Sequence, residues 1–346
     1  MTLHQTVDAA GTTPPSARDW VMILAKYRDP DLMRSLREII LTLVPFLAIW
    51  AAAWAALSVS YVLALALAVV NAFFLVRIFA IQHDCGHSAF FRNKRLGDWV
   101  GRALGVLTLT PYDTWRRAHS IHHASSGNLD KRGMGDINTL TVEEYRDAGF
   151  WTRLMYRLYR NPLVMFGIGP IYIFLLTNRL PFGFWNNRLF WASTMGSNVF
   201  LLAILAAVYV FGGWAPILLI FLPTSILAGS IGIWLFYVQH QFEEGHWDHE
   251  PEWQVHDAAF HGSSHYVLPG VFQWLTANIG IHHVHHLYAR IPFYRLPEVL
   301  RDHPALDQAQ RLTFRESLAC LKLHLWDEAE RRMLTWREAR DKYQPA

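Results

Sequence analysis

Four long apolar stretches limit the possible folds of this chain more than any other feature of its sequence. They cover residues 39–59, 61–81, 189–211 and 214–238. Each stretch has about 20 residues, which is the length an α-helix needs to cross the hydrocarbon core of a bilayer. Inside lipid the backbone must satisfy its own hydrogen bonds, and a continuous apolar run does so as a helix. We therefore expect an all-α integral membrane protein with four transmembrane helices.

The connectors between these stretches predict two hairpins and an orientation. Ser60 alone separates the first pair, and Gly212 and Gly213 separate the second pair. These connectors contain no Lys or Arg, whereas the loop between the hairpins contains many, among them Arg92 and Lys94. Basic loops stay in the cytoplasm. Both termini and the long loop are therefore expected on the cytoplasmic side, where the loop would form a helical cap.

A fifth apolar segment, residues 163–177, is too short and too interrupted for a simple span. It contains Gly167, Gly169 and Pro170, and its length of about fifteen residues suits an interfacial or re-entrant segment. The single charge inside the four spans is Arg77, near the end of the second span. We expect this side chain to extend along the helix toward the lipid headgroups.

Composition supports the membrane assignment and divides the chain into three parts. Charged residues make up 17% of the sequence, against roughly 25% in soluble proteins. The net charge of +3 without a basic tail argues against nucleic acid as a partner. We expect an N-terminal tail and interfacial segment over residues 1–38, a membrane domain over 39–300, and a cytoplasmic helical segment over 301–346.

Three histidine clusters predict a metal site. They occupy residues 83–87, 119–123 and 282–286, and all three lie on the expected cytoplasmic side. Helical residues three or four apart project from the same face, so each cluster presents a convergent set of imidazoles. His240 ends the fourth span and is a candidate ninth ligand. The candidate ligands are His83, His87, His119, His122, His123, His240, His282, His285 and His286.

The number of imidazoles predicts two metal ions. A structural zinc takes four ligands, usually including thiolates, and imidazole suits iron, copper and zinc alike. Soluble di-iron bundles use paired Glu-x-x-His motifs, whereas this chain has one such motif, at Glu243 and His246. His283 lies off the shared helix face and is not expected to bind metal. The remaining loop histidines are expected to be solvated or structural: His246, His249, His256, His261 and His265.

Polar residues close to the clusters are candidates for orienting the histidines. A metal-bound imidazole usually donates its other N–H to a carboxylate or a carbonyl. Four residues are placed to accept such a bond, with a helix cap or a surface position as the alternative reading of each: Asp84, Asp113, Asp257 and Asn278.

The three clusters also carry a family resemblance. HDCGH, HSIHH and HHVHH resemble the three histidine boxes of the membrane fatty-acid desaturases. The flanking segments QHDCGHSAFF, SGNLDKRGMGDINTLTVEEY, YVQHQFEE and QWLTANIGIHHVHHL are similar to the bacterial acyl-lipid desaturases, in the branch with omega-6 (delta-12) and delta-5 enzymes. The similarity covers roughly residues 35 to 300.

This resemblance implies a function and its cofactors. The eight box histidines and the additional His240 would bind two iron ions in a non-haem di-iron centre. The enzyme would use O2 and two electrons to introduce a double bond into an acyl chain of a membrane lipid. No cytochrome b5 domain is recognisable at either end, so a separate donor of the ferredoxin or cytochrome b5 type would supply the electrons. The expected location is the bacterial cytoplasmic membrane.

Two other functions remain open from the residues alone. A di-iron hydroxylase or monooxygenase would share the metal site, although the flanking segments favour desaturation. A membrane metal-binding or transport protein would place ionisable groups near the bilayer midplane. These spans are nearly free of ionisable residues, which argues against transport. The position of the double bond and the choice between lipid-linked and CoA-linked substrates are not specified by the sequence.

Overall fold

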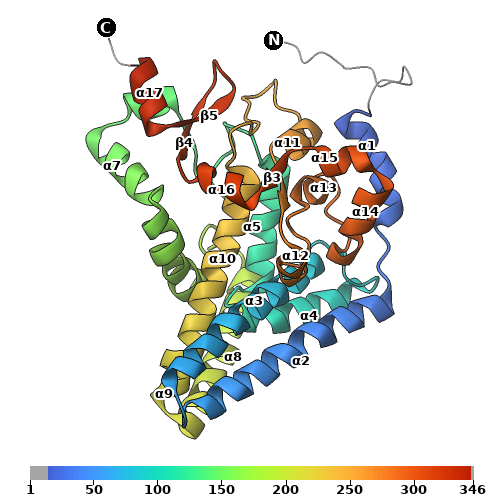
Figure 1. The fold of residues 1–346 in the computed structure, drawn as a ribbon, viewed down its shortest axis with the longest axis vertical. Helices are drawn as coiled ribbons and strands as arrows, with labels where there is room; N and C mark the ends of the chain where they lie inside the picture. The colour runs from blue at the N-terminus through green and yellow to red at the C-terminus, as the bar shows by residue number, and fades with distance from the viewer. Residues whose placement is uncertain (1–14, 344–346) are drawn as a thin grey trace.

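The computed structural model describes residues 15–343, and four long apolar helices dominate it. They are α2 (Leu32–Ala56), α3 (Tyr61–Gly86), α8 (Arg188–Gly212) and the run Trp214–His240, which ends in α10 (Leu222–His240). Each is long and apolar enough to cross a membrane. The last three helices contain the expected stretches and extend them by a few residues, whereas α2 begins at Leu32, before the expected residue 39, and ends at Ala56, before the expected residue 59. Figure 1 shows them crossing the lower part of the molecule.

Local sequence signals set where these helices begin and end. The Asp31 side chain accepts a hydrogen bond from the backbone N–H of Arg34 at 2.8 Å and caps α2. Ser60 caps α3 in the same way through the N–H of Leu63. α8 ends before Gly213, whose backbone φ of 66° is one that residues other than glycine rarely adopt. The second hairpin is therefore as tight as the sequence predicts, whereas the turn of the first spans residues 57–60 and not Ser60 alone.

The fifth apolar segment is bent. α7 (Phe150–Tyr159) leads into a run that includes the π-helical turns η2 (Val164–Ile168) and η3 (Ile171–Leu176) and ends with η4 (Thr177–Arg179). The two parts meet at an angle of 64°, as in a broken span or a re-entrant loop. Proline residues interrupt the run at Pro162 and Pro170, and a proline removes a helical hydrogen bond. The segment is therefore not an uninterrupted helix, and its bend fits either the expected re-entrant segment or a broken span.

Arg77 corrects a prediction, because its side chain does not extend to the headgroups. The residue is 1% exposed and forms an ion pair with Glu38 of α2. Its Nε donates a hydrogen bond to Thr42 Oγ1 at 3.0 Å, and its guanidinium lies 4.0 Å from the centre of the Trp274 ring. A buried charge is tolerated when it is paired and fully hydrogen-bonded, and α2 supplies both partners.

Short helices form the polar end of the molecule, where both ends of the described chain lie (Figure 1). Those that carry or support the histidines are α4 (Lys94–Leu107), α5 (Tyr112–Ser125), α11 (Val255–His261), α12 (Gly270–Leu275) and α13 (His282–Leu287). The others are α1 (Ala17–Leu24), α6 (Val142–Asp147), α14 (Leu296–Asp302), α15 (Pro304–Gln308), α16 (Phe314–Cys320) and α17 (Trp336–Tyr343). Residues 1–14 of the expected N-terminal tail lie outside the described residues.

Two small sheets modify the all-α expectation. β1 (Leu140–Thr141), β4 (Leu323–Asp327) and β5 (Arg332–Thr335) form one sheet, with β1 parallel and β5 antiparallel to β4. β2 (His265–Val267) pairs in parallel with β3 (Arg311–Thr313). Segment 301–346 is therefore not purely helical as expected. β4 is buried along its whole length, and a short buried strand has no alternating pattern that would distinguish it from a helix.

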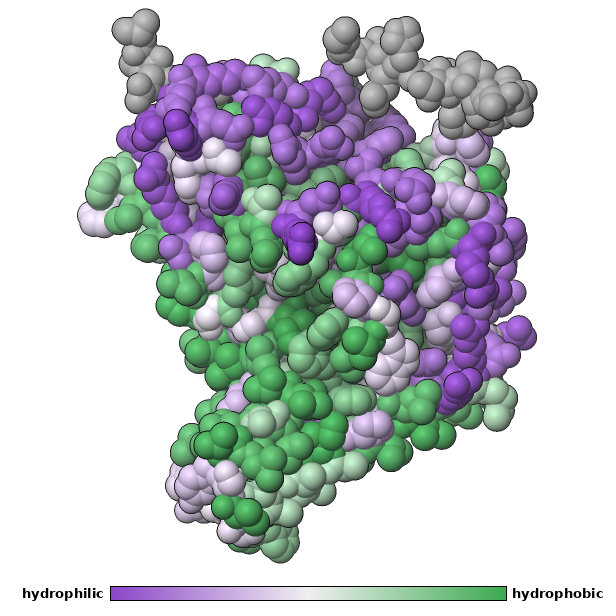
Figure 2. Space-filling view, in the orientation of Figure 1, coloured by the Kyte–Doolittle hydropathy of each residue, from purple (hydrophilic) through white to green (hydrophobic). Residues whose placement is uncertain are grey.

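The surface divides into an apolar and a polar region. Figure 2 shows hydrophobic residues over the lower part of the molecule, where the long helices lie, and hydrophilic residues over the upper part. Large apolar side chains are exposed along α8, including Val199, Phe200 and Phe211. A soluble protein rarely exposes a continuous apolar surface of this extent. The exposed side chains are those expected to face lipid.

Candidate metal centre

Five histidines form the first of two groups. His83 lies on the last turn of α3 and His87 caps that helix, while the other three come from α5 and α13: His119, His123 and His285. One ring nitrogen from each residue lies within 4.8 Å of all the others. The Nε2 atoms of His285 and His123 are 3.1 Å apart. Two nitrogens bound to one metal at about 2.1 Å lie roughly 3 Å apart, so this spacing matches that of metal ligands.

Four histidines form the second group: His122, His240, His282 and His286. His122 comes from α5, His240 is the last residue of α10, and the other two come from α13. The Nε2 atoms of His282 and His240 are 3.0 Å apart, and those of His122 and His286 are 3.3 Å apart. The structure therefore brings together all nine histidines singled out in the sequence.

α5 and α13 each contribute to both groups, which places the groups side by side. On α5, His119 and His123 turn to the first group while His122 turns to the second. The rings of His123 and His286, one from each group, are stacked with their centres 4.2 Å apart. Adjacent positions on a helix diverge by about 100°, so one HxxHH motif can serve two neighbouring sites.

Electrostatics favour the neutral, metal-binding form of these rings. Burial, reinforced by the neighbouring imidazoles, lowers the pKa of His119, His123 and His285 well below the usual value. Only a neutral imidazole has a free lone pair for a metal. Nε2 of His87 is buried without a hydrogen-bond partner in the described structure. A buried polar atom without a partner is unfavourable, and a metal ion would satisfy it.

The four polar residues proposed to orient the histidines have different surroundings. Asp84 Oδ1 lies 3.2 Å from Nδ1 of His83, and its other oxygen accepts the backbone N–H of Phe293 at 2.7 Å. Asp113 instead accepts two hydrogen bonds from Arg102, at 2.9 and 3.0 Å. Asn278 donates to the carbonyl of Phe293 at 3.2 Å. The negative charge of Asp257 instead acts on His246 and His261, where it partly offsets the lowering of their pKa by burial. Asp84 is thus the one of the four with a histidine partner in the two groups, within the described residues.

Asp136 is a partner that the sequence reading missed. Its carboxylate contacts Nδ1 of the fully buried His122. The loop that carries it packs against α5 at Gly135, where an added Cβ would lie 3.2 Å from the Cβ of His122. The available signal was an acid directly after Gly135 in the segment that follows the second cluster, but nothing in the spacing points back to His122. The carbonyl of Gly262 supports His240 in a similar way, 3.3 Å from its Nδ1.

The other histidines named in the sequence lie outside the two groups. His283 Nε2 bonds to the carbonyl of Leu306 at 2.8 Å. His246 pairs with Asp248, and His249 pairs with Asp130. The remaining three are His256 and His261, both on α11, and His265, at the start of β2.

A pocket of about 490 Å³ lies beside the first group. His87 forms part of its wall. Its charged lining consists of four cations and one acid: Arg28, Arg92, Lys94, Arg290 and Asp29. The lining of the pocket beside His87 therefore has a net positive charge.

Comparison with known proteins identifies relatives of the whole chain. The family model described as "Fatty acid desaturase" matches residues 59–317. A "Fatty acid desaturase" from Bacillus subtilis is 46% identical over 318 residues, which cover 91% of this chain and 89% of the relative.

Two proteins of Synechocystis sp. are also similar. One, an "sn-1 oleoyl-lipid 12-desaturase", is 26% identical over 236 residues, 64% of this chain and 63% of its own. The other, an "sn-1 acyl-lipid omega-3 desaturase (ferredoxin)", is 36% identical over 99 residues, 28% of this chain and 25% of its own.

Proposed function

The chain belongs to the fatty acid desaturase family, and on this premise we propose that it is an acyl-lipid desaturase with two irons bound by its two histidine groups. It is therefore an oxidoreductase associated with the membrane through its apolar helices. In the proposed reaction two adjacent methylene carbons lose one hydrogen each and form a double bond. One O2, two electrons and two protons are consumed, and two water molecules are released.

The observation that carries this proposal is the division of nine imidazoles, six buried and three half-buried, into a group of five and a group of four. Each group has enough nitrogen donors for one metal ion. Bound iron would supply O2 activation and one-electron transfer, which acid and base side chains cannot provide. Among the described residues, neither group includes a carboxylate.

The protein's own residues orient the ligands and place the site. Asp84 and Asp136 bind the outer ring nitrogens of His83 and His122, which fixes ring orientation and tautomer. His83 and His240 end two of the long apolar helices, so the centre lies where the apolar region meets the polar cap. A lipid acyl chain could reach it without passing through water.

We place this centre, the cap and both termini on the cytoplasmic side, in a bacterial cytoplasmic membrane. The basic loops around the cap support this orientation. In the same proposal residues 39–300 form the desaturase domain, flanked by segments 1–38 and 301–346.

A separate electron donor is part of the proposal. The cationic pocket beside His87 would attract a protein with an acidic surface, and one similar protein carries ferredoxin in its name. Replacement of Arg92 and Lys94 by Glu should raise the KM for such a donor and weaken its dependence on salt. An unchanged KM at low salt would refute this docking position.

Expression in a host without desaturases tests the function. The wild-type protein should produce unsaturated fatty acids in the membrane lipids, located by mass spectrometry. His122→Ala should insert normally and produce none, because the second group would lose a ligand. A hydroxylated product, or wild-type product levels from the variant, would contradict the assignment.

A further inference from the structure

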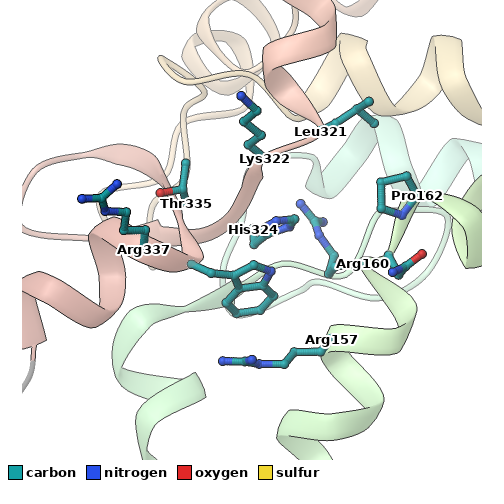
Figure 3. Close-up of a pocket in the computed structure, with 10 residues that line it drawn as sticks. Arg157, Arg160, Pro162, Leu321, Lys322, His324, Thr335 and Arg337 are labelled. Carbon is teal, nitrogen blue, oxygen red and sulfur yellow. The ribbon is translucent and has the colours of Figure 1, made fainter.

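A second cationic pocket lies away from the histidines, between the end of α7 and the C-terminal sheet. Its volume is about 520 Å³. Figure 3 shows Arg160 and His324 beside each other at its centre, with Arg157, Lys322 and Arg337 around them. The residues that line it include four cations and no carboxylate. A pocket with this lining is suited to an anion.

Arg160 carries a buried charge without a counter-ion. It is 3% exposed. Its guanidinium donates to neutral acceptors, namely Gln241 Oε1 at 2.8 Å and the carbonyls of Leu323 at 3.0 Å and Asn138 at 3.4 Å. Its Nε has no partner, and its acidic neighbours within residues 15–343 are tyrosines and not carboxylates. Burying an unpaired charge is costly, so an anion in this pocket would stabilise the fold.

His324 offers a second unsatisfied group. It is 7% exposed, its Nδ1 has no partner in the described structure, and its ring stacks on Trp336 with centres 4.6 Å apart. Burial and the charges of Arg160 and Arg157 lower the pKa of His324 to about 4. The ring is therefore neutral at physiological pH and still has one N–H to donate.

Arg157 is held in place by neutral groups. Its Nε donates to Tyr145 Oη at 2.6 Å, and its guanidinium lies 5.0 Å from the centre of the Trp336 ring. Arg337, in contrast, pairs with Asp341 at 3.5 Å. The cations available to an anion are therefore Arg157 and Arg160 of the α7 end, together with Lys322 before β4.

The surface next to the pocket is apolar. Pro162 lines the pocket, and the following residue, Leu163, is 83% exposed. On α7 itself Trp151 and Met155 are 73% and 61% exposed. The pocket thus lies where the polar cap meets an apolar surface that continues into the bent segment 164–179. Such a boundary between an apolar and a polar surface is where we expect the phosphate groups of a bilayer to lie.

We propose that this pocket binds the phosphate group of a membrane phospholipid, whose acyl chains lie along the exposed apolar side of α7 and the bent segment. Arg157, Arg160 and Lys322 neutralise the phosphate, and His324 donates a hydrogen bond to it. Arg160 also bonds to Gln241, the residue after His240. The bound lipid therefore ties the C-terminal sheet to the end of α10.

Thermal unfolding of the full-length protein in a neutral detergent tests this site. The three probes are dioctanoyl-phosphatidylglycerol, dioctanoylglycerol and inorganic phosphate. The phospholipid should raise the unfolding temperature with a saturable dependence on its concentration. Dioctanoylglycerol should have no such effect, and inorganic phosphate should act only at much higher concentrations.

Arg157→Gln should raise the concentration of phospholipid needed for half the effect by about tenfold or more, since a charged hydrogen bond is lost. Lys322→Gln, on a different element, should act in the same direction. Arg153→Gln is the matched control, because it removes an exposed charge from the same helix outside the pocket lining.

Three results would overturn the proposal. They are an equal effect of dioctanoylglycerol, an equal loss in Arg153→Gln and Arg157→Gln, and inorganic phosphate acting at the same concentration as the phospholipid. The third result would exclude a lipid as the natural ligand.

Discussion

Each of the two histidine groups has one carboxylate partner. Asp84 contacts His83 of the five-histidine group, and Asp136 contacts His122 of the four-histidine group. A carboxylate on the outer ring nitrogen holds the proton there and leaves the inner nitrogen as a metal ligand. Oδ2 of Asp136 is buried with no hydrogen-bond partner in the described structure. Among the described residues His122 is therefore the side chain that satisfies this carboxylate.

Asp136→Asn should therefore impair the proposed metal centre without removing a ligand. Loss of such a carboxylate typically lowers metal affinity or activity about 10–100-fold. The measurements are iron bound per chain at limiting iron and the amount of unsaturated product. Asp257→Asn is the control and should retain both. Wild-type iron binding and product from Asp136→Asn would show that the carboxylate does not support the site.

Helical spacing made the eight clustered histidines predictable, and the end of the fourth span pointed to His240; the remaining contacts of the site are tertiary. His83 and His87, or His282 and His286, share a helix face whatever the surrounding fold. Asp136 reaches His122 through a loop, and no local rule fixes where a loop returns. The contact of Asp113 with Arg102 on the neighbouring helix α4 was not predictable for the same reason.

At the level of elements, the long helices act as supports with the histidines at their ends. α3 and α10 end at the site, whereas α5 and α13 cross it and serve both groups. Length and hydropathy predicted α2, α3, α8 and α10 because each is long and apolar enough to cross a membrane by its own sequence, whatever its neighbours. The Arg77 contacts were not predictable, because they depend on α2 and α12 lying against α3.

The Arg77–Glu38 ion pair should be a main link between α2 and α3. Arg77→Met leaves Glu38, 13% exposed, without its partner, which should cost about 3–5 kcal/mol of stability. Thermal unfolding in detergent measures this, with the exposed Arg37→Gln on α2 as control. Adding Glu38→Gln to Arg77→Met should recover part of the loss. Equal unfolding temperatures for Arg77→Met and Arg37→Gln would contradict the link.

On the scale of the whole molecule, the surface has an apolar half and a polar half (Figure 2). The histidine groups lie at the ends of the long helices α3 and α10. In the proposed topology four spans would return the chain to the side on which it started, as the meeting of all three histidine clusters requires. The sheet of β1, β4 and β5 was not foreseen, because it joins residues near 140 to residues near 325. Such long-range pairing leaves no local pattern in the sequence.

Cysteine labelling tests the proposed orientation. The native cysteines, Cys85 and Cys320, are buried, so the background should be low. Ser58→Cys in the first hairpin turn should react with an impermeant maleimide added to intact spheroplasts. Arg153→Cys on α7 should react only after lysis. The opposite pattern would place the cap outside the cytoplasm.

The central claim is that the two histidine groups bind two irons. Anomalous diffraction at the iron absorption edge, from crystals of the iron-loaded protein, tests it most directly. We predict two iron peaks, one among His83, His87, His119, His123 and His285, and the other among His122, His240, His282 and His286. A single iron peak, or peaks that appear at the zinc edge and not at the iron edge, would contradict the claim.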